Sequence, residues 1–394
     1  MYIPKRENGK SPQIPLLLES SRNALLIIST ERDTEKLMKM KMKRKINIIF
    51  PVLLCCMSFV WVSCNKEDID DSKHVSITQP NITFLASVNG LGDNGYNDNA
   101  IGGVLSFIDK YDTRFHLLLP STKAEAELLY RTWLNDNALK DSSLIILGSS
   151  DYEDIACKYP TSFMGKGTQV LLFECRNSNT PLNVHSLCIN RYGCSYLAGA
   201  MSTDRDAKIW AATSEDSIIK TAIRGFMDGY NLHNKDQNTL SVKYLTNKDE
   251  GFAVPDSVYK EMKKEYDDDV FSEDIIFPLL GFSGLGMIRY ANENTFFAPW
   301  IIGMDINQKG LSINIPFSMV IKIGDMLKEM LEDWRKGKKW EKVILKGMAD
   351  NAIDIEFTPD FYENIILGDP ADYEELYKIY HKEALEKDGY EKTK

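Results

Sequence analysis

The chain has 394 residues, with 47 Lys and Arg against 57 Asp and Glu, so its formal net charge is −10. From Ile46 onward the balance is 36 (47 minus 11) against 52 (57 minus 5), a net charge of −16. This acidity argues against nucleic acid as a partner, because binding a phosphate backbone needs a basic surface. The part from residue 75 to the end, about 320 residues, is longer than one compact core usually serves, so we expect two lobes.

The first recognisable segment in chain order is an export signal at residues 38–64. A basic cluster (39–45) precedes an apolar run (46–62), and a serine and Cys64 follow. The small residue before the cysteine resembles the cleavage box of bacterial lipoproteins, in which the cysteine is lipidated and becomes the mature N-terminus. Because Trp61 departs from that box and the run is about long enough to cross a bilayer, an uncleaved transmembrane anchor stays open as the alternative.

The segments beside this signal carry separate expectations. Residues 1–37 show neither an amphipathic period nor a core pattern, and export signals begin close to the initiator, so Met38 or a methionine just after it is the expected start. Residues 65–78 are acidic and polar. They are either a solvated tether or a segment similar to the surface-export signal of lipoproteins in some Gram-negative bacteria. In both cases the rest of the chain is expected outside the cytoplasm, held at the membrane by the lipid on Cys64.

Four cysteines follow the signal, at Cys157, Cys175, Cys188 and Cys194. In an oxidising compartment two of them can form a disulfide, but the sequence does not give the pairing. None of them has a Cys or His partner at the spacing of a zinc site, so the sequence points to no metal.

Beyond residue 80 short apolar runs alternate with amphipathic stretches. A capping box at Thr122 and Glu125 predicts a helix through Asn135, and 217–230 places its apolar residues on one face. This repetition predicts an α/β protein with parallel sheets covered by helices on both faces. A polar helix is expected at 371–387, packed on the outside. The predicted strands are 82–89, 115–119, 144–148, 169–174, 184–189, 208–212, 241–244, 275–278 and 300–304.

The loop after the first predicted strand is the richest in polar side chains. In doubly wound sheets ligands lie at the carboxyl ends of strands, so this loop is a candidate binding site. Asp93, Asn94 and Asn97 can hydrogen-bond a polar ligand, and Tyr96 offers a flat ring for stacking. On composition alone a simple turn, with Asn97 or Asp98 as the helix N-cap, is the competing interpretation.

Five short motifs occur in the order in which one known family carries them. The loop GDNGYND (92–98) resembles the Gly…Asp-Lys-Ser-Phe-Asn motif of the basic membrane protein family, lipoprotein solute-binding proteins known for purine nucleosides. The other four are similar to that family's later motifs, and the similarity spans roughly residues 80–358. They are SYLAG at 195–199, FMDGY at 226–230, GFSGLG at 281–286 and IGMDINQ at 302–308.

The resemblance implies a type I periplasmic-binding-protein fold, in which two Rossmann-like lobes close on a ligand in the cleft between them. It places the three chain crossings near residues 183, 313 and 340. The N-terminal lobe would comprise 79–183 and 314–340, the C-terminal lobe 184–313 and 341–360, and a helical extension would follow at 361–394.

The same resemblance implies where the ligand binds. Members of the family hold the ribose hydroxyls with an Asp and a Lys and enclose the base between aromatic rings, and here Asp305 and Lys322 match those two positions. Against this, Asp305 could serve only as a turn cap, Lys322 could be a solvated residue, and Tyr192 and Phe282 could be ordinary core. The implied binding residues are Asp93, Asn94, Tyr96, Asn97, Ser150, Tyr192, Phe282, Gly284, Asp305 and Lys322.

The expected function is that of an extracytoplasmic lipoprotein that captures a purine nucleoside for ABC-type import, without a cofactor. Asn94-Gly95 replaces the family's Lys-Ser, and Asn307 replaces its second Asp, so ligand identity stays open. The alternative is a surface lipoprotein of the same fold that serves an outer-membrane uptake complex or a sensor. An enzyme is not expected, because the five histidines show no ligand spacing and no Gly-x-Ser-x-Gly elbow occurs.

Overall fold

The computed structural model describes residues 81–392 except 138–141, 160–163, 166, 247–248, 267–271 and 359–369. The expected signal at 38–64, with Cys64, and the segments 1–37 and 65–78 lie outside the described residues. Within the described ranges, no helix is both long enough and apolar enough to cross a membrane.

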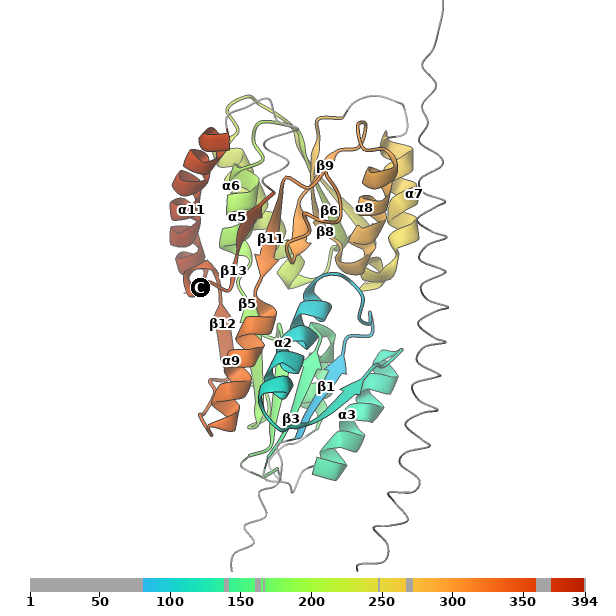
Figure 1. Ribbon diagram of the computed structural model, residues 1–394, viewed down its shortest axis with the longest axis vertical. Coiled ribbons are helices and arrows are strands. Elements are labelled where there is room, and N and C mark those ends of the chain that lie inside the picture. Colours follow the sequence, from blue (N-terminus) through green and yellow to red (C-terminus); the bar gives the residue numbers. More distant parts are fainter. Residues whose placement is uncertain are drawn as a thin grey trace, which may run out of the picture. The chain divides into compact units, whose positions relative to one another are not determined.

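The N-terminal lobe is built on a six-stranded, fully parallel sheet (Figure 1). Its central strands are continuous apolar runs, and β3 is buried along its whole length, as expected for a sheet covered on both faces. The strand order is β12-β5-β4-β3-β1-β2. The strands are β1 (Asn81–Ala86), β2 (Arg114–Leu118), β3 (Ser143–Gly148), β4 (Gln169–Phe173), β5 (Val184–Ile189) and β12 (Val343–Lys346).

Helices cover both faces of this sheet. Phe84 of β1 packs in a core with α2 (Tyr96–Lys110) and α9 (Ile323–Arg335). Leu85, the next residue, packs in a second core with α3 (Lys123–Asn137) and α4 (Glu153–Lys158). A short 3₁₀ turn, Ser150–Tyr152, directly precedes α4. The alternation of side chains along the strand thus separates two layers.

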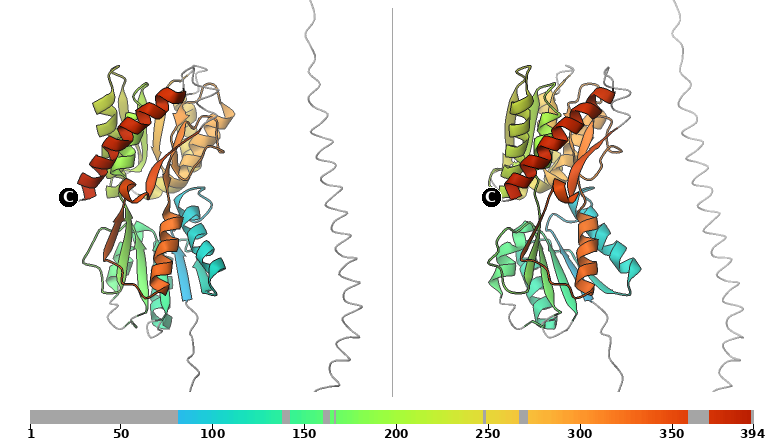
Figure 2. Two further views of the ribbon diagram at one scale, coloured as in Figure 1. Left: turned by 60° about the vertical axis from the view of Figure 1, so that its left-hand side comes forward. Right: turned by 90° about the vertical axis from the view of Figure 1, so that its left-hand side faces the viewer.

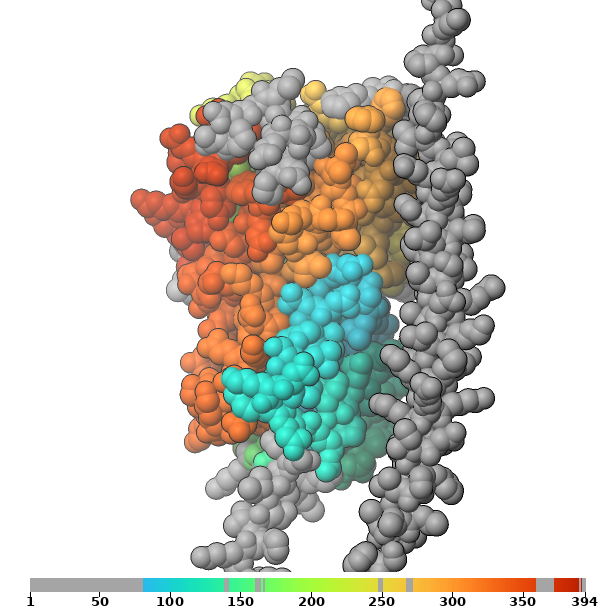
Figure 3. Space-filling model, viewed as in Figure 1, coloured from blue at the N-terminus to red at the C-terminus, as the bar shows by residue number. Residues whose placement is uncertain are grey.

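Helices α2 and α9 touch at their backbones, and the space-filling view shows the two segments side by side (Figure 3). A Cβ added at Gly103 would lie 2.1 Å from the carbonyl oxygen of Gly324. The amide N–H of Gly324 donates to Oδ1 of Asn99 at 2.7 Å. Only glycine permits this close approach of the two helix backbones.

The C-terminal lobe contains two smaller sheets. A parallel sheet has the order β7-β6-β8-β9, and a three-stranded sheet has the order β10-β11-β13. In the latter β11 and β13 are antiparallel, which the expectation of purely parallel sheets did not include. The strands are β6 (Ala207–Thr213), β7 (Leu240–Thr246), β8 (Ile275–Leu279), β9 (Trp300–Ile301), β10 (Gly303–Asp305), β11 (Phe317–Ile321) and β13 (Ile353–Phe357).

One helix of this lobe was expected from its sequence pattern. Helix α6 buries the apolar face anticipated at 217–230, and Asp216 caps it by accepting from the amides of Ile218 (2.6 Å) and Ile219 (3.1 Å). The helices are α5 (Tyr192–Ala200), α6 (Ser217–His233), α7 (Pro255–Tyr266) and α8 (Gly284–Glu293), with 3₁₀ turns at Asp249–Ala253, Gly281–Ser283 and Met348–Asp350.

Three segments of chain connect the lobes (Figure 2). Strand pairing puts β5 and β12 in the six-stranded sheet of the N-terminal lobe and β11 in the three-stranded sheet of the C-terminal lobe. The crossings therefore fall at 190–191, at 322 and at 347–352. Each lies several residues beyond the expected positions near 183, 313 and 340. The difference arises because an apolar strand pattern indicates burial but not which sheet the strand joins.

The C-terminal helix α11 (Pro370–Lys392) contains the expected helix 371–387 and packs along α5. Asp388 of α11 is fully buried. Its carboxylate accepts from Nδ2 of Asn190 at 2.9 Å and from the amide of Met348 at 3.1 Å. These two residues belong to the first and third crossings, so one carboxylate ties both crossings to the helix.

The four cysteines that could have formed a disulfide are free thiols. Cys175, Cys188 and Cys194 are buried, whereas Cys157 is exposed. Burial raises the pKa of Cys188 to about 12, which keeps this thiol protonated and unreactive.

Candidate ligand-binding cleft

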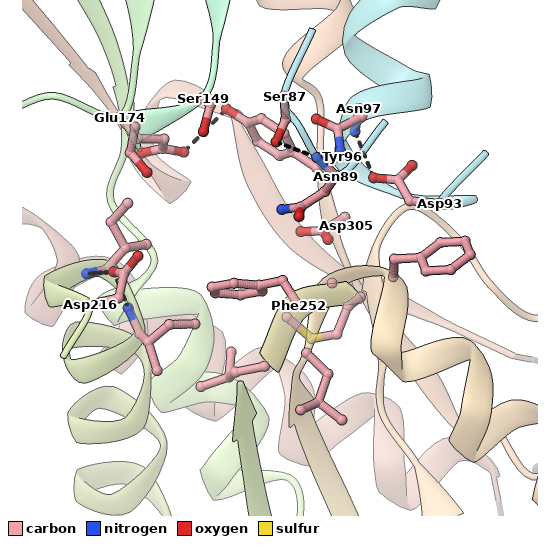
Figure 4. Close-up of a pocket in the computed structure, with 18 of the residues that line it drawn as sticks. Ser87, Asn89, Asp93, Tyr96, Asn97, Ser149, Glu174, Asp216, Phe252 and Asp305 are labelled. Carbon is pink, nitrogen blue, oxygen red and sulfur yellow. Dashed lines mark hydrogen bonds between the residues drawn. The ribbon is translucent and has the colours of Figure 1, made fainter. Parts of the chain in front are cut away.

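A cavity of about 190 Å³ lies between the lobes, at the carboxyl ends of strands from each lobe (Figure 4). Parallel strands end at the same edge of a sheet, so the loops that follow them converge there. Both lobes contribute to the lining, and their contributions differ in chemistry.

The N-terminal lobe supplies a polar wall. Each group of lining residues directly follows a strand or begins the helix after it, which explains why residues far apart in sequence meet here. The polar lining residues of this lobe are Ser87 and Asn89 after β1, Asp93, Tyr96 and Asn97 at the start of α2, Ser149, Ser150 and Asp151 after β3, Glu174 after β4, and Arg191 after β5.

The C-terminal lobe supplies a mostly apolar wall with two carboxylates, those of Asp216 and Asp305. A ligand that fits both walls therefore has an apolar or aromatic face and a hydrogen-bonding edge. The apolar lining residues are Ile218, Ile219 and Ala222 of α6, Phe252, Pro278, Leu279 and Leu280, Phe282, and Met304.

The loop before α2 is held by two carboxylates that bind its own backbone. Asp93 accepts from the amides of Gly95 (3.0 Å), Asn97 (3.0 Å) and Asp98 (3.3 Å). Asp98 accepts from the amides of Gly92 (2.7 Å) and Asn94 (2.9 Å). Burial raises the pKa of Asp93 above its usual value, although these backbone donors oppose the effect. Asp93 thus serves as a turn-forming group even though it lines the cavity.

Tyr96 is fixed by one contact to its hydroxyl and another to its ring. Its hydroxyl donates to Oε1 of Glu174 at 3.2 Å, and its ring meets Phe173 edge to face with centroids 5.9 Å apart. Burial, followed by the nearby charge of Glu174, raises the pKa of Tyr96 well above its ordinary value. The ring therefore presents a neutral surface to the cavity at physiological pH.

Glu174 and Arg191 form an ion pair at the polar wall. Nη2 of Arg191 lies 2.8 Å from Oε1 of Glu174, and the side chains are only 11% and 8% exposed. The amide of Ile189 also donates to Oε2 of Glu174, at 3.1 Å. Burial lowers the pKa of Arg191, but the charge and hydrogen bond of Glu174, together with the nearby Tyr96 and Asp305, outweigh burial and raise that pKa, so the guanidinium stays charged.

Asp305 ends β10 and faces the cavity from the C-terminal lobe. Among the described residues none donates a hydrogen bond to its carboxylate. Burial raises the pKa of Asp305 to about 6, with Arg191 opposing the shift and Asp93 and Glu174 adding to it. Its φ of 67° lies in the left-handed region that side chains rarely adopt, and Glu174 has a φ of 59°. Such strained residues concentrate at functional sites.

The structure brings six of the ten expected residues into the cavity lining, namely Asp93, Tyr96, Asn97, Ser150, Phe282 and Asp305. Gly284 lines a small hollow beside the cavity, which shares Asp305 with it. Asn94 is not in the lining, and its carbonyl oxygen accepts from Nε2 of Gln308 at 3.2 Å.

Tyr192 and Lys322 do not line the cavity. The Tyr192 hydroxyl donates to Oδ2 of Asp228 at 2.6 Å, because the first residue of α5 turns its ring toward α6. Nζ of Lys322 donates to Oδ1 of Asn351 at 2.6 Å, because this lysine belongs to the second crossing and reaches across to the third.

Among the lining residues that were not anticipated from the sequence, four matter most for the chemistry of the cavity, namely Glu174, Arg191, Asp216 and Phe252. Glu174 is the first residue after β4 and Arg191 the second after β5, so the strand-end rule, applied to every strand, points to both. Asp216 is visible as a helix N-cap. Phe252 lies in a short 3₁₀ turn, and the sequence carries no pattern that marks it.

Two α/β lobes joined by three crossings around a cavity define a type I periplasmic binding protein. Solved structures agree with this class. The chain is similar to an ABC transporter solute-binding protein from Aeropyrum pernix K1, with a TM-score of 0.61 at 14% identity over 79% of this chain and 88% of that one. It is also similar to a protein from Bacillus halodurans described as a transcriptional activator of the comK gene, with a TM-score of 0.57 at 15% identity over 77% and 96%.

A third similar structure is an ABC transporter solute-binding protein from Burkholderia graminis C4D1M in complex with D-arabinose, with a TM-score of 0.52 at 11% identity over 73% of this chain and 98% of that one. No curated protein sequence is significantly similar to this chain. The family model of the ABC transporter substrate-binding proteins described as PnrA-like, Bmp, matches residues 81–383. The chain belongs to this family and is therefore a solute-binding protein of the ABC-transporter class.

Proposed function

We propose that this protein captures a purine nucleoside outside the cytoplasm and delivers it to an ABC importer. The observation that carries the proposal is the carboxylate of Asp305, which faces the cavity without a donor from the described residues while burial raises its pKa. A buried polar group is stable only when it finds a partner. The hydroxyl groups of a ribose are suitable donors, since a carboxylate forms strong hydrogen bonds to hydroxyls in a water-poor cleft.

The aromatic lining supports the base half of this proposal. Tyr96 lies on the polar wall, and Phe252 and Phe282 lie on the apolar wall. Aromatic rings recognise a base by stacking, with little regard to its substituents. The neighbouring amides and hydroxyls of Asn89, Asn97 and Ser150 are available to bind the polar edge of the base.

The proposal is tested by thermal-shift screening of the purified chain with nucleosides, bases and small sugars, followed by calorimetry. We expect guanosine, inosine or adenosine to bind with a dissociation constant in the micromolar range or tighter, about −8 kcal/mol or more favourable. At a hundredfold excess over that constant the ligand should stabilise the fold by about 2.7 kcal/mol. If folded, ligand-free protein gives no heat and no shift with any nucleoside at millimolar concentration, the nucleoside assignment is withdrawn.

We also propose that Cys64 is lipidated and anchors the protein to a membrane, since the 38–64 segment is similar to a lipoprotein signal. Cys64→Ala should then give an unprocessed precursor that incorporates no fatty-acid analogue in metabolic labelling. Equal labelling of this variant and the wild type would contradict the assignment. Expression of the variant with a matched Cys157→Ala control separates loss of the acceptor from a general effect of removing a thiol.

The acidic segment 65–78 favours one competing role, a surface lipoprotein that serves an outer-membrane uptake complex or a sensor. The position of Lys322 outside the cavity adds to this alternative, since the family's second ribose contact is then missing. Protease treatment of intact cells distinguishes the two roles, because only a surface-exposed chain is digested before the outer membrane is broken.

A further inference from the structure

The ion pair of Glu174 and Arg191 is placed where it can act on the ligand rather than only on the fold. Glu174 is the first residue after β4, and Arg191 lies in the first crossing between the lobes. Burying two charges costs free energy that their attraction repays only with good geometry, so a buried pair is weak evidence for a stabilising role. Among the described lining residues, Arg191 is also the single basic side chain, whereas several lining residues are carboxylates.

The pair holds the Tyr96 ring. The Tyr96 hydroxyl donates to Oε1 of Glu174, the bond drawn beside the label of Glu174 in Figure 4. The guanidinium carbon of Arg191 lies 5.7 Å from the centroid of the same ring. Phe173 contacts the ring edge to face. The orientation of Tyr96 therefore depends on both members of the pair.

The pair also acts on Asp305 across the cleft. The charged groups that face Asp305 are Arg191, which favours the ionised carboxylate, and Asp93 and Glu174, which oppose it. The three come from the first crossing, the loop before α2 and the end of β4, whereas Asp305 comes from the C-terminal lobe. Asp305 of the C-terminal lobe thus lies in the electric field of an ion pair that is fixed in the N-terminal lobe.

We propose that Glu174 and Arg191 are positioning residues: together they orient the Tyr96 ring for stacking, and Arg191, held in place by Glu174, keeps Asp305 ionised for hydrogen bonding in the cleft. This inference rests on the proposed function, since Tyr96 and Asp305 are the groups that would contact a nucleoside. It narrows the ligand class to neutral or cationic molecules with hydrogen-bond donors, because the net charge of the lining repels phosphate and carboxylate groups.

The first test needs no ligand. The titration of the Asp305 carboxyl is followed by NMR in protein labelled at aspartate, with the resonance assigned by its loss in Asp305→Asn. We expect Glu174→Gln to lower the titration midpoint and Arg191→Met to raise it, because the two charges act on Asp305 with opposite sign. Arg191 has a larger effect than Glu174 on the pKa of Asp305. The double variant Glu174→Gln/Arg191→Met, which lacks both charges, should therefore also titrate with a raised midpoint.

The double variant matters because Arg191→Met alone leaves a buried carboxylate without its partner and could fail to fold. A matched control is the pair of Arg224 and Glu391, whose Nη2 and Oε2 atoms lie 2.6 Å apart in the C-terminal lobe outside the cavity lining. Neutralising that pair should leave the Asp305 midpoint unchanged. Equal midpoints in the wild type, the Glu174→Gln variant and the double variant would overturn the positioning role.

The second test uses guanosine, inosine and adenosine in calorimetry across a range of pH. We expect the double variant to bind nucleosides at least about tenfold more weakly than the wild type. The fall of its affinity at low pH should begin at a higher pH, while its unfolding temperature stays close to that of the wild type. Wild-type affinity and pH profile in the double variant would make the pair merely structural. If the wild type binds no nucleoside, the proposed function fails and the ligand-free titration alone decides the positioning role.

Discussion

Asp305→Asn tests the chemistry of the cleft, because it removes a charge while keeping the shape of the side chain. Burial raises the pKa of Asp305 from 3.8 to about 6, so the ionised carboxylate is disfavoured in the ligand-free fold. Allowing for screening by the open cleft, this difference corresponds to a cost on the order of 1 to 3 kcal/mol above that pH. We therefore expect the amide to raise the unfolding temperature at neutral pH by about 2 °C or more.

Ligand binding should change in the opposite direction. A carboxylate that accepts from two ribose hydroxyls contributes roughly 2 to 4 kcal/mol, so Asp305→Asn should lose about thirtyfold to a thousandfold in nucleoside affinity. A variant that is more stable and binds less well is typical of a strained binding site. This combination distinguishes a ligand contact from a turn cap, whose loss would lower stability and leave the affinity nearly unchanged.

The pH dependence follows from the same carboxyl group. Because its pKa is raised in the folded protein, the native state holds this proton more tightly, and the stability of the ligand-free protein falls as the pH rises from about 4 to about 6. Affinity runs the other way, since hydroxyl donors need the ionised acceptor: it should be constant above about pH 7 and decline below about pH 6. Asp305→Asn should remove both dependences.

Calorimetry and thermal unfolding between about pH 5 and 8 measure both effects on the same preparations. Asp256→Asn is a suitable control, because that carboxylate is 81% exposed and pairs only at the surface with Arg289. Wild-type affinity in a destabilised Asp305→Asn protein would remove Asp305 from the binding site.

The remaining predictions concern packing and the crossings. Gly103→Ala should cost about 1 to 3 kcal/mol in urea unfolding, because its Cβ would lie 2.1 Å from the backbone of α9, whereas Gly102→Ala, which meets open space, should be neutral or stabilising by up to about 1 kcal/mol. Asp388→Ala leaves the amide of Met348 without its acceptor and weakens the hold on Asn190, whose Nδ2 keeps the Asp388 carbonyl oxygen, so it should cost about 1 to 3 kcal/mol; unchanged stability would argue against a role of this carboxylate in holding the crossings. Lys322→Ala should leave nucleoside affinity nearly unchanged, and a large loss would return this lysine to the site.

The α/β class and the positions of three helices could be predicted because their signals are local. The capping position of Thr122 appears in the structure, where its Oγ1 accepts from the amide of Glu125 at 3.1 Å. The apolar face of α6 is likewise buried as its periodicity indicates. The partners of β5 and β11 could not be predicted, because pairing depends on the whole sheet and a buried strand has the same pattern in either lobe.

The site was predictable where a polar residue follows a recognisable strand and matches a family motif, as Asp305 and Tyr96 do. Lys322 matched a family position but lies where its side chain reaches Asn351, and sequence spacing does not give side-chain direction. Arg191 was missed because a lone arginine in a sequence is usually solvated. Its role becomes visible only when the fold brings Glu174 to within 2.8 Å.

A crystal structure of the protein with guanosine tests the central claim most directly. We predict that the nucleoside lies in the cavity between the lobes, with its ribose hydroxyls at hydrogen-bond distance from the carboxylate of Asp305 and its base against the ring of Tyr96. A nucleoside bound elsewhere, or a cavity that stays empty at saturating guanosine while another class of solute fills it, would contradict the proposed function.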